Sequence, residues 1–240
     1  MLRCSFLIAM LAVAGVSGAE DSPTVAHTTT LTALFPADKA KSLATTIPAD
    51  KALRYRVRMP PGKGPSGVLV FVKSGESGEM PSDWTAQLDA RNLIWIAAED
   101  FGNEHPSAQR ILATIAALKF IESTATIDAK RLYLGGISGG GRIASQIMAR
   151  FPQYFRGALF IVGADFWTAS EEPFLPQIVA NRYVFITGSA DFNQLSMQRV
   201  YSKYRRAGVT AAMLMDLPHF GHQLPNAEQL GKAIDFLDAR

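Results

Sequence analysis

Short apolar runs rich in β-branched residues alternate with longer helical patterns along most of this sequence. The expected strands are Leu53–Met59, Gly67–Val72, Leu93–Ala98, Arg131–Leu134, Ala158–Val162, Tyr183–Thr187 and Thr210–Met215. The expected helices are Ser82–Arg91, Ser107–Glu122, Ser138–Arg150, Asn193–Ala207 and Ala227–Asp238. Such alternation predicts the α/β class, with a mostly parallel central sheet and helices on both faces. Functional loops of such sheets gather at the carboxyl ends of the strands.

The first residues have the layout of a secretory signal peptide. Arg3 is followed by the apolar run Phe6–Val16, and Ser17-Gly18-Ala19 supplies the small residues that precede a cut. We therefore expect residues 1–19 to be removed after Ala19, which leaves a secreted or periplasmic protein with no stable membrane span. The run is about half of the ~20 residues needed to cross a bilayer. The only cysteine, Cys4, lies in this segment, so the processed chain would have no thiol.

The remaining chain is expected to form one domain. Residues 51–240 contain the strand and helix patterns without a Ser/Gly linker, and residues 20–50 are interpreted as a lead-in or an edge hairpin. Lys and Arg number 24 against 21 Asp and Glu, with the signs interspersed, so we expect no nucleic-acid partner. The histidines have no third metal ligand at a recognisable spacing, so no metal and no cofactor is expected.

The string Gly136-Ile-Ser138-Gly-Gly140 stands between an expected strand and an expected helix. A nucleophile on so sharp a turn has a strained backbone, and its neighbours two positions before and after must be small. The helix that follows would direct free N–H groups at Ser138, where negative charge develops in acyl transfer. The alternative is a glycine-rich turn that lets a helix pack closely on the sheet.

A serine hydroxyl needs a base, and a base needs a carboxylate that orients it. His222 and His219 both follow the last expected strand, and we favour His222 because Gly221 gives the backbone freedom to aim it. Asp191 follows the strand Tyr183–Thr187 and is the preferred acid. Its rivals are Asp165, which lies one strand earlier, and Asp216, which is too near His219 in sequence to orient His222 easily.

The order Ser138, Asp191, His222, together with the strings Ile127–Arg142, Thr187–Asp191 and Phe220–His222, resembles the α/β-hydrolases. Within that superfamily the chain is most similar to secreted esterases related to polyhydroxybutyrate depolymerases, feruloyl esterases and dienelactone hydrolases. The resemblance implies an oxyanion hole made of two backbone N–H groups. One is that of Gly139, and the other comes from the loop after an early strand, where Ser74 and Gly75 are both candidates. This loop reads Lys73-Ser74-Gly75 where the family usually has His-Gly.

These residues predict a secreted or periplasmic serine carboxylesterase that acts on a small-molecule or polymer-derived ester. Peptide or amide hydrolysis on the same three residues is the alternative within catalysis, and a binding protein that has lost turnover is the alternative outside it. The segment Asp165–Arg182 is too short for a large lid domain. Aromatic side chains near the strand ends could line the substrate pocket or merely pack under loops. These are Phe166, Trp167, Phe192 and Phe220.

Overall fold

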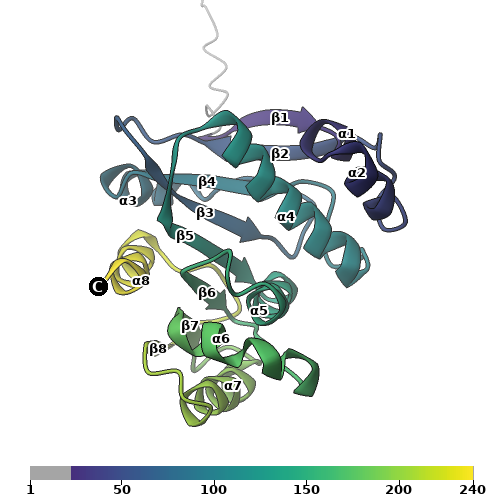
Figure 1. Ribbon diagram of the computed structural model, residues 1–240. Helices are drawn as coiled ribbons and strands as arrows, with labels where there is room; N and C mark the ends of the chain where they lie inside the picture. The colour runs from purple at the N-terminus through teal and green to yellow at the C-terminus, as the bar shows by residue number, and fades with distance from the viewer. Residues whose placement is uncertain (1–22, 240) are drawn as a thin grey trace, which may run out of the picture.

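The computed structural model of the protein describes residues 23–239, which form an eight-stranded sheet with helices on both faces (Figure 1). The strands are β1 (Val25–Thr29), β2 (Leu53–Arg58), β3 (Ser66–Val72), β4 (Leu93–Ala98), β5 (Ile127–Ile137), β6 (Gly157–Ile161), β7 (Arg182–Gly188) and β8 (Ala212–Leu217). The α-helices are α1 (Leu31–Leu34), α2 (Ala37–Leu43), α3 (Thr85–Ala90), α4 (Ser107–Thr124), α5 (Gly139–Arg150), α6 (Leu175–Ala180), α7 (Gln194–Arg206) and α8 (Ala227–Asp238). Two 3₁₀ turns, Ser82–Trp84 and Ala169–Phe174, precede α3 and α6.

The strand order is β1-β2-β4-β3-β5-β6-β7-β8, and strands β3 to β8 run parallel. Only β1 and β2 pair in the antiparallel sense, with each other and, for β2, with β4. The α/β class and the mostly parallel sheet predicted from the sequence are confirmed. The carboxyl ends of β5, β7 and β8 lie on one edge of the sheet, and this is the edge that carries Ser138, Asp191 and His222.

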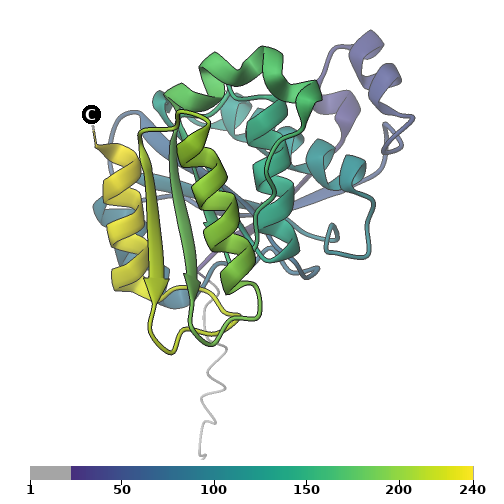
Figure 2. The same cartoon turned by 90° about the horizontal axis from the view of Figure 1, so that it is seen from below.

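Burial along the strands explains why the sequence forms them. Every residue of β3 is buried, as expected for a central strand covered on both sides, whereas β2 alternates between buried and more exposed positions. Helices α3 and α8 cover one face of the sheet, and α4, α5 and α7 cover the other (Figures 1 and 2). Under α3 and α8, the Phe71 and Trp95 rings are stacked and Trp84 meets both edge-on, so aromatic packing supports the face opposite α5.

The N-terminal part of the described chain extends the sheet by one strand. Strand β1 pairs along β2 from Val25 to Thr29, and α1 and α2 follow it. The signal peptide expected over residues 1–19, and Cys4 within it, lie outside the described residues. Among residues 23–239, no helix has both the length and the apolar character that crossing a membrane requires.

Candidate active site

Ser138 lies at the junction between β5 and α5, in a backbone conformation that non-glycine residues rarely adopt. Its φ is 55° and its ψ is −122°, and its N–H donates to the carbonyl of Ile161 on β6 at 2.8 Å. Such strain costs free energy and persists only where the surroundings impose it. The turn therefore holds the Ser138 side chain at the carboxyl edge of the sheet, at the N-terminus of α5.

Gly136 and Gly140 make this sharp turn possible because other atoms occupy the space where their side chains would be. A Cβ on Gly136 would lie 2.4 Å from the carbonyl oxygen of Gly140, and a Cβ on Gly140 would lie 2.0 Å from the carbonyl oxygen of Val72. The first turn of α5 thus packs directly against the end of β3. The sequence-based expectation that both positions must be small is confirmed.

We expect Gly140→Ala to lower both stability and activity, because the new methyl group collides with the backbone of Val72, which cannot rotate away. Overpacking of this kind costs about 1–3 kcal/mol of unfolding free energy, and it would also push α5 away from β3. Denaturant unfolding and ester turnover of the variant measure the two effects. Gly221→Ala is the matched control, because its Cβ would meet only the Ala190 carbonyl oxygen at 3.9 Å. Equal behaviour of the two variants would contradict this prediction.

Two hydrogen bonds join Ser138, His222 and Asp191. Nε2 of His222 lies 2.8 Å from Oγ of Ser138, and Nδ1 lies 2.9 Å from Oδ1 of Asp191. An ionised carboxylate can only accept hydrogen bonds, so Nδ1 carries the proton and Nε2 accepts from the serine hydroxyl. The arrangement can therefore draw the hydroxyl proton onto the imidazole while the carboxylate stabilises the resulting charge.

The Asp191 side chain is fully buried and its carboxylate is held from three sides. Oδ1 accepts from the Asn193 N–H at 3.1 Å as well as from His222, and Oδ2 accepts from the Thr187 hydroxyl at 2.9 Å. Sequence reasoning did not single out Thr187. It is the second-to-last residue of β7 and lies four residues before Asp191, but only the fold of the intervening turn brings its hydroxyl to the carboxylate.

The loop that carries His222 is tied to the loop that carries Asp191. The His219 N–H donates to the Ser189 hydroxyl at 2.8 Å, and the Ala190 N–H donates to the Phe220 carbonyl at 3.1 Å. The expectation that Gly221 supplies the backbone freedom here is wrong, because the left-handed residue of this turn is His219, with φ 57°. The strained position directs the chain so that His222, and not His219, contacts Ser138.

The rival carboxylates have other partners. Asp165 accepts from Arg142 at 2.8 Å and from Gln146 at 3.1 Å, and Asp216 accepts from Gln194 and Gln198. Neither is bonded to a histidine within the described residues. The structure thus joins His222 to Asp191, the acid that the sequence favoured.

No protein-family model matches this sequence, and no curated protein matches it. Solved structures do resemble it: S-formylglutathione hydrolase from Staphylococcus aureus has a TM-score of 0.67 at 11% identity, over 89% of this chain and 95% of that one. The fluorophosphonate-binding serine hydrolase F of Staphylococcus aureus has a TM-score of 0.63 at 13% identity, over 90% and 98%. A ferulic acid esterase has a TM-score of 0.61 at 14% identity, over 89% and 98%. The chain has the α/β-hydrolase fold. At these identities the likeness shows the fold and nothing finer.

In this α/β-hydrolase fold the loop after β3 lies beside the start of α5. Among the described residues, the N–H groups of Ser74 and Gly75, the two candidate oxyanion donors, form no hydrogen bond, and neither does that of Glu76. The structure therefore adds Glu76 to the candidates. Lys73 stands where the family usually has histidine, and its ammonium donates to the Glu79 backbone carbonyl at 3.0 Å. Burial lowers the pKa of this ammonium, and the negative charge of Glu79 offsets part of the effect.

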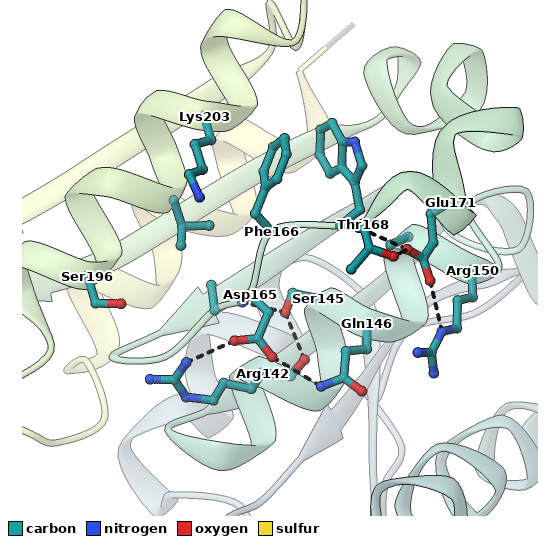
Figure 3. Close-up of a pocket in the computed structure, with 14 residues that line it drawn as sticks. Arg142, Ser145, Gln146, Arg150, Asp165, Phe166, Thr168, Glu171, Ser196 and Lys203 are labelled. Carbon is teal, nitrogen blue, oxygen red and sulfur yellow. Dashed lines mark hydrogen bonds and ion pairs between the residues drawn. The ribbon is translucent and has the colours of Figure 1, made fainter.

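A cavity of about 490 Å³ lies between α5, α7 and the loop after β6 (Figure 3). Its lining residue nearest to Ser138 in the sequence is Arg142, one helical turn further along α5. Asp165 also lines the cavity and is hydrogen-bonded to Arg142 and Gln146. Phe166 and Trp167 form its aromatic wall, with their ring centroids 4.0 Å apart. Two of the four aromatic residues that the sequence nominated thus line a cavity near the serine.

The other two aromatic residues have different surroundings. The Phe192 side chain is 80% exposed, and its ring is stacked on the His222 ring with a centroid separation of 4.2 Å. Phe220 is 5% exposed and packs with the core residues between the sheet and α8. Of the two interpretations that the sequence left open for Phe220, its burial fits packing and not a place in the substrate pocket. Within residues 23–239, no group of three or more His, Cys, Asp or Glu side chains could hold a metal ion.

Proposed function

We propose that this protein is a serine carboxylesterase that hydrolyses an ester through an acyl-enzyme. The observation that carries the proposal is the pair of hydrogen bonds from His222 to Ser138 and Asp191, at 2.8 and 2.9 Å, on a strained turn at the N-terminus of α5. The similar solved structures named above are described as hydrolases or as an esterase, which supports this reaction class. The sequence of residues 1–19 supports export to the periplasm or the medium.

In the acylation step, Oγ of Ser138 attacks the ester carbonyl carbon while Nε2 of His222 takes the hydroxyl proton. Negative charge develops on the former carbonyl oxygen, where the Gly139 N–H and one N–H of the Ser74–Glu76 loop would bind it. Asp191 stabilises the imidazolium through the Nδ1–H bond. Collapse of the tetrahedral intermediate breaks the ester C–O bond, and the alcohol leaves with the proton from Nε2.

In the deacylation step, a water molecule takes the place of the alcohol. His222 removes one proton from it as the oxygen attacks the acyl-serine carbonyl, and the second tetrahedral intermediate expels the serine oxygen, which regains the proton. The products are the carboxylic acid and the free enzyme.

We place the part of the substrate that does not react in the cavity bounded by Phe166 and Trp167, because this cavity begins one turn of α5 from Ser138.

A reaction panel with purified protein tests the proposal. We expect an alkyl fluorophosphonate to label the wild-type chain at Ser138, and p-nitrophenyl esters of short acids and of cinnamic acid to be hydrolysed faster than the matching p-nitroanilides. The expectation rests on an activated serine whose hydroxyl is already bonded to imidazole. Faster cleavage of the anilides would make the protein an amidase or peptidase. If the protein is not labelled and hydrolyses neither the esters nor the anilides, it is a binding protein.

A further inference from the structure

Arg110, in the first turn of α4, is 5% exposed, and its guanidinium donates to backbone carbonyls from three separate segments. Nη2 donates to Lys73 O at 2.8 Å, Nε donates to Phe101 O at 3.1 Å, and Nη1 reaches Gly139 O at 3.4 Å. These carbonyls belong to the loop after β3, the loop after β4 and the first turn of α5. One side chain thus links the three segments next to Ser138.

Burying the charge of Arg110 costs free energy of desolvation, so we expect a role of this side chain beyond filling space. No carboxylate of the described residues lies within ion-pair distance of Arg110, so its charge is compensated by carbonyl dipoles and by the more distant negative charge of Glu76. Burial lowers the pKa of the Arg110 guanidinium, but the ordinary pKa of arginine is so high that the group stays charged. An apolar residue of similar size would avoid this desolvation cost, but it would take the donor away from the Lys73 and Phe101 carbonyls.

One of the three carbonyls, Lys73 O, belongs to the same peptide group as a candidate oxyanion donor. That donor is the Ser74 N–H, and because the peptide group is planar, a bond to the oxygen also fixes the direction of the N–H. The loop after β4 holds the next peptide, because the Asn103 N–H donates to Ser74 O at 2.9 Å. The Asn103 side chain also lies against Gly139, where a Cβ would be 2.1 Å from Oδ1.

We propose that Arg110 is a positioning residue for the oxyanion site, which it forms by holding the loop after β3 and the loop after β4 against the first turn of α5. The planar fork of the guanidinium is required, because three different nitrogens donate to the three carbonyls, whereas the three N–H groups of a lysine ammonium share one nitrogen. This inference rests on the proposed esterase function. It gives α4 a role in the reaction through Arg110, although α4 carries none of Ser138, His222 and Asp191.

The test compares Arg110→Met and Arg110→Lys with the wild type and with Arg182→Met. Arg182 is the matched control, because it also donates to a carbonyl, Phe236 O at 2.7 Å, and lies at the start of β7, away from the carboxyl edge. For each protein one measures kcat, KM, the melting temperature, the fraction of sites titrated by fluorophosphonate, and the affinity for an alkylboronic acid, whose serine adduct is tetrahedral and anionic.

We expect Arg110→Met to lower kcat per titrated site about a hundredfold, which is the usual loss when one oxyanion donor is removed. KM should stay within about threefold, and boronate affinity should fall in the same proportion as kcat, because both depend on stabilising the oxyanion. Arg110→Lys should recover only part of the loss. Arg182→Met should melt at a lower temperature with unchanged kcat.

The proposal is overturned if Arg110→Met keeps its kcat per titrated site and loses only melting temperature, because Arg110 would then be structural. It is also overturned if Arg110→Lys has full kcat, because charge without the fork would suffice. If Arg110→Met does not fold, Arg110→Lys decides, with at least about a tenfold loss of kcat expected. Wild-type protein that neither turns over esters nor reacts with fluorophosphonate would refute the proposed function itself.

Discussion

Ser138→Ala is expected to reduce ester turnover by at least about ten-thousandfold, as loss of a serine nucleophile does in related reactions. The variant has no oxygen to attack the carbonyl carbon, and His222 loses the hydroxyl to which Nε2 is bonded at 2.8 Å. The fold should survive, because alanine fits the same turn and the backbone bond from residue 138 to Ile161 O does not involve the side chain. Steady-state kinetics and the melting temperature of the purified variant measure both parts.

The control for this variant is Ser196→Ala, which removes a hydroxyl from the neighbouring cavity but none that is bonded to His222. Its kcat should stay within a few-fold of the wild type, and fluorophosphonate should still label it. A Ser138→Ala protein that keeps more than about a tenth of the wild-type kcat would show that another group is the nucleophile.

Asp191→Asn is expected to lower kcat by roughly 10³- to 10⁴-fold, the scale seen when the acid of a serine triad is replaced by its amide. The carboxylate of Asp191 accepts from Nδ1–H of His222, whereas an amide can present N–H at that position and stabilise the tautomer whose Nε2 carries the proton. That tautomer cannot accept the Ser138 proton. The amide oxygen can keep the bond from the Thr187 hydroxyl, but the bond from the Asn193 N–H is lost, so we expect the fold to be kept with a lower melting temperature.

Asp165→Asn is the matched comparison, because it makes the same chemical change one strand earlier. Its carboxylate is bonded to Arg142 and Gln146, and both members of the Asp165–Arg142 pair are more than one-third exposed. Pairs of this kind contribute little to stability, and His222 is bonded to Asp191 and not to Asp165, so kcat should stay within about threefold of the wild type. A larger loss for Asp165→Asn than for Asp191→Asn would move the acid to the loop after β6.

Local patterns in the sequence were sufficient to predict the central sheet. The runs expected as strands correspond to β2 through β8, and the five expected helices correspond to α3, α4, α5, α7 and α8. These elements are recognisable because burial on one or both faces leaves a periodic apolar pattern. Residues 20–50 were interpreted only as a lead-in or an edge hairpin, so the bounds of β1, α1 and α2 were not predicted, and neither was α6. These elements are short, and their pairing or packing depends on distant segments.

The residues of the candidate site divide in the same way. The sequence alone determined the glycine-flanked turn at Ser138 and the order of serine, acid and histidine, because strand ends and tight turns leave local signatures that survive without knowledge of the fold. Which of Phe192 and Phe220 faces the solvent was decided by tertiary structure, because Phe220 packs in the core between the sheet and α8, whereas Phe192 is 80% exposed beside the His222 ring.

Tertiary structure also decided the partners of Arg110. Its three carbonyl acceptors, at positions 73, 101 and 139, are separated in the sequence by up to 66 residues, the difference between 139 and 73. No periodicity or motif relates them, because a carbonyl exists at every position and only packing selects those that meet a given side chain. The sequence thus specified which groups could perform the chemistry, and the packed fold determined the contacts that orient them.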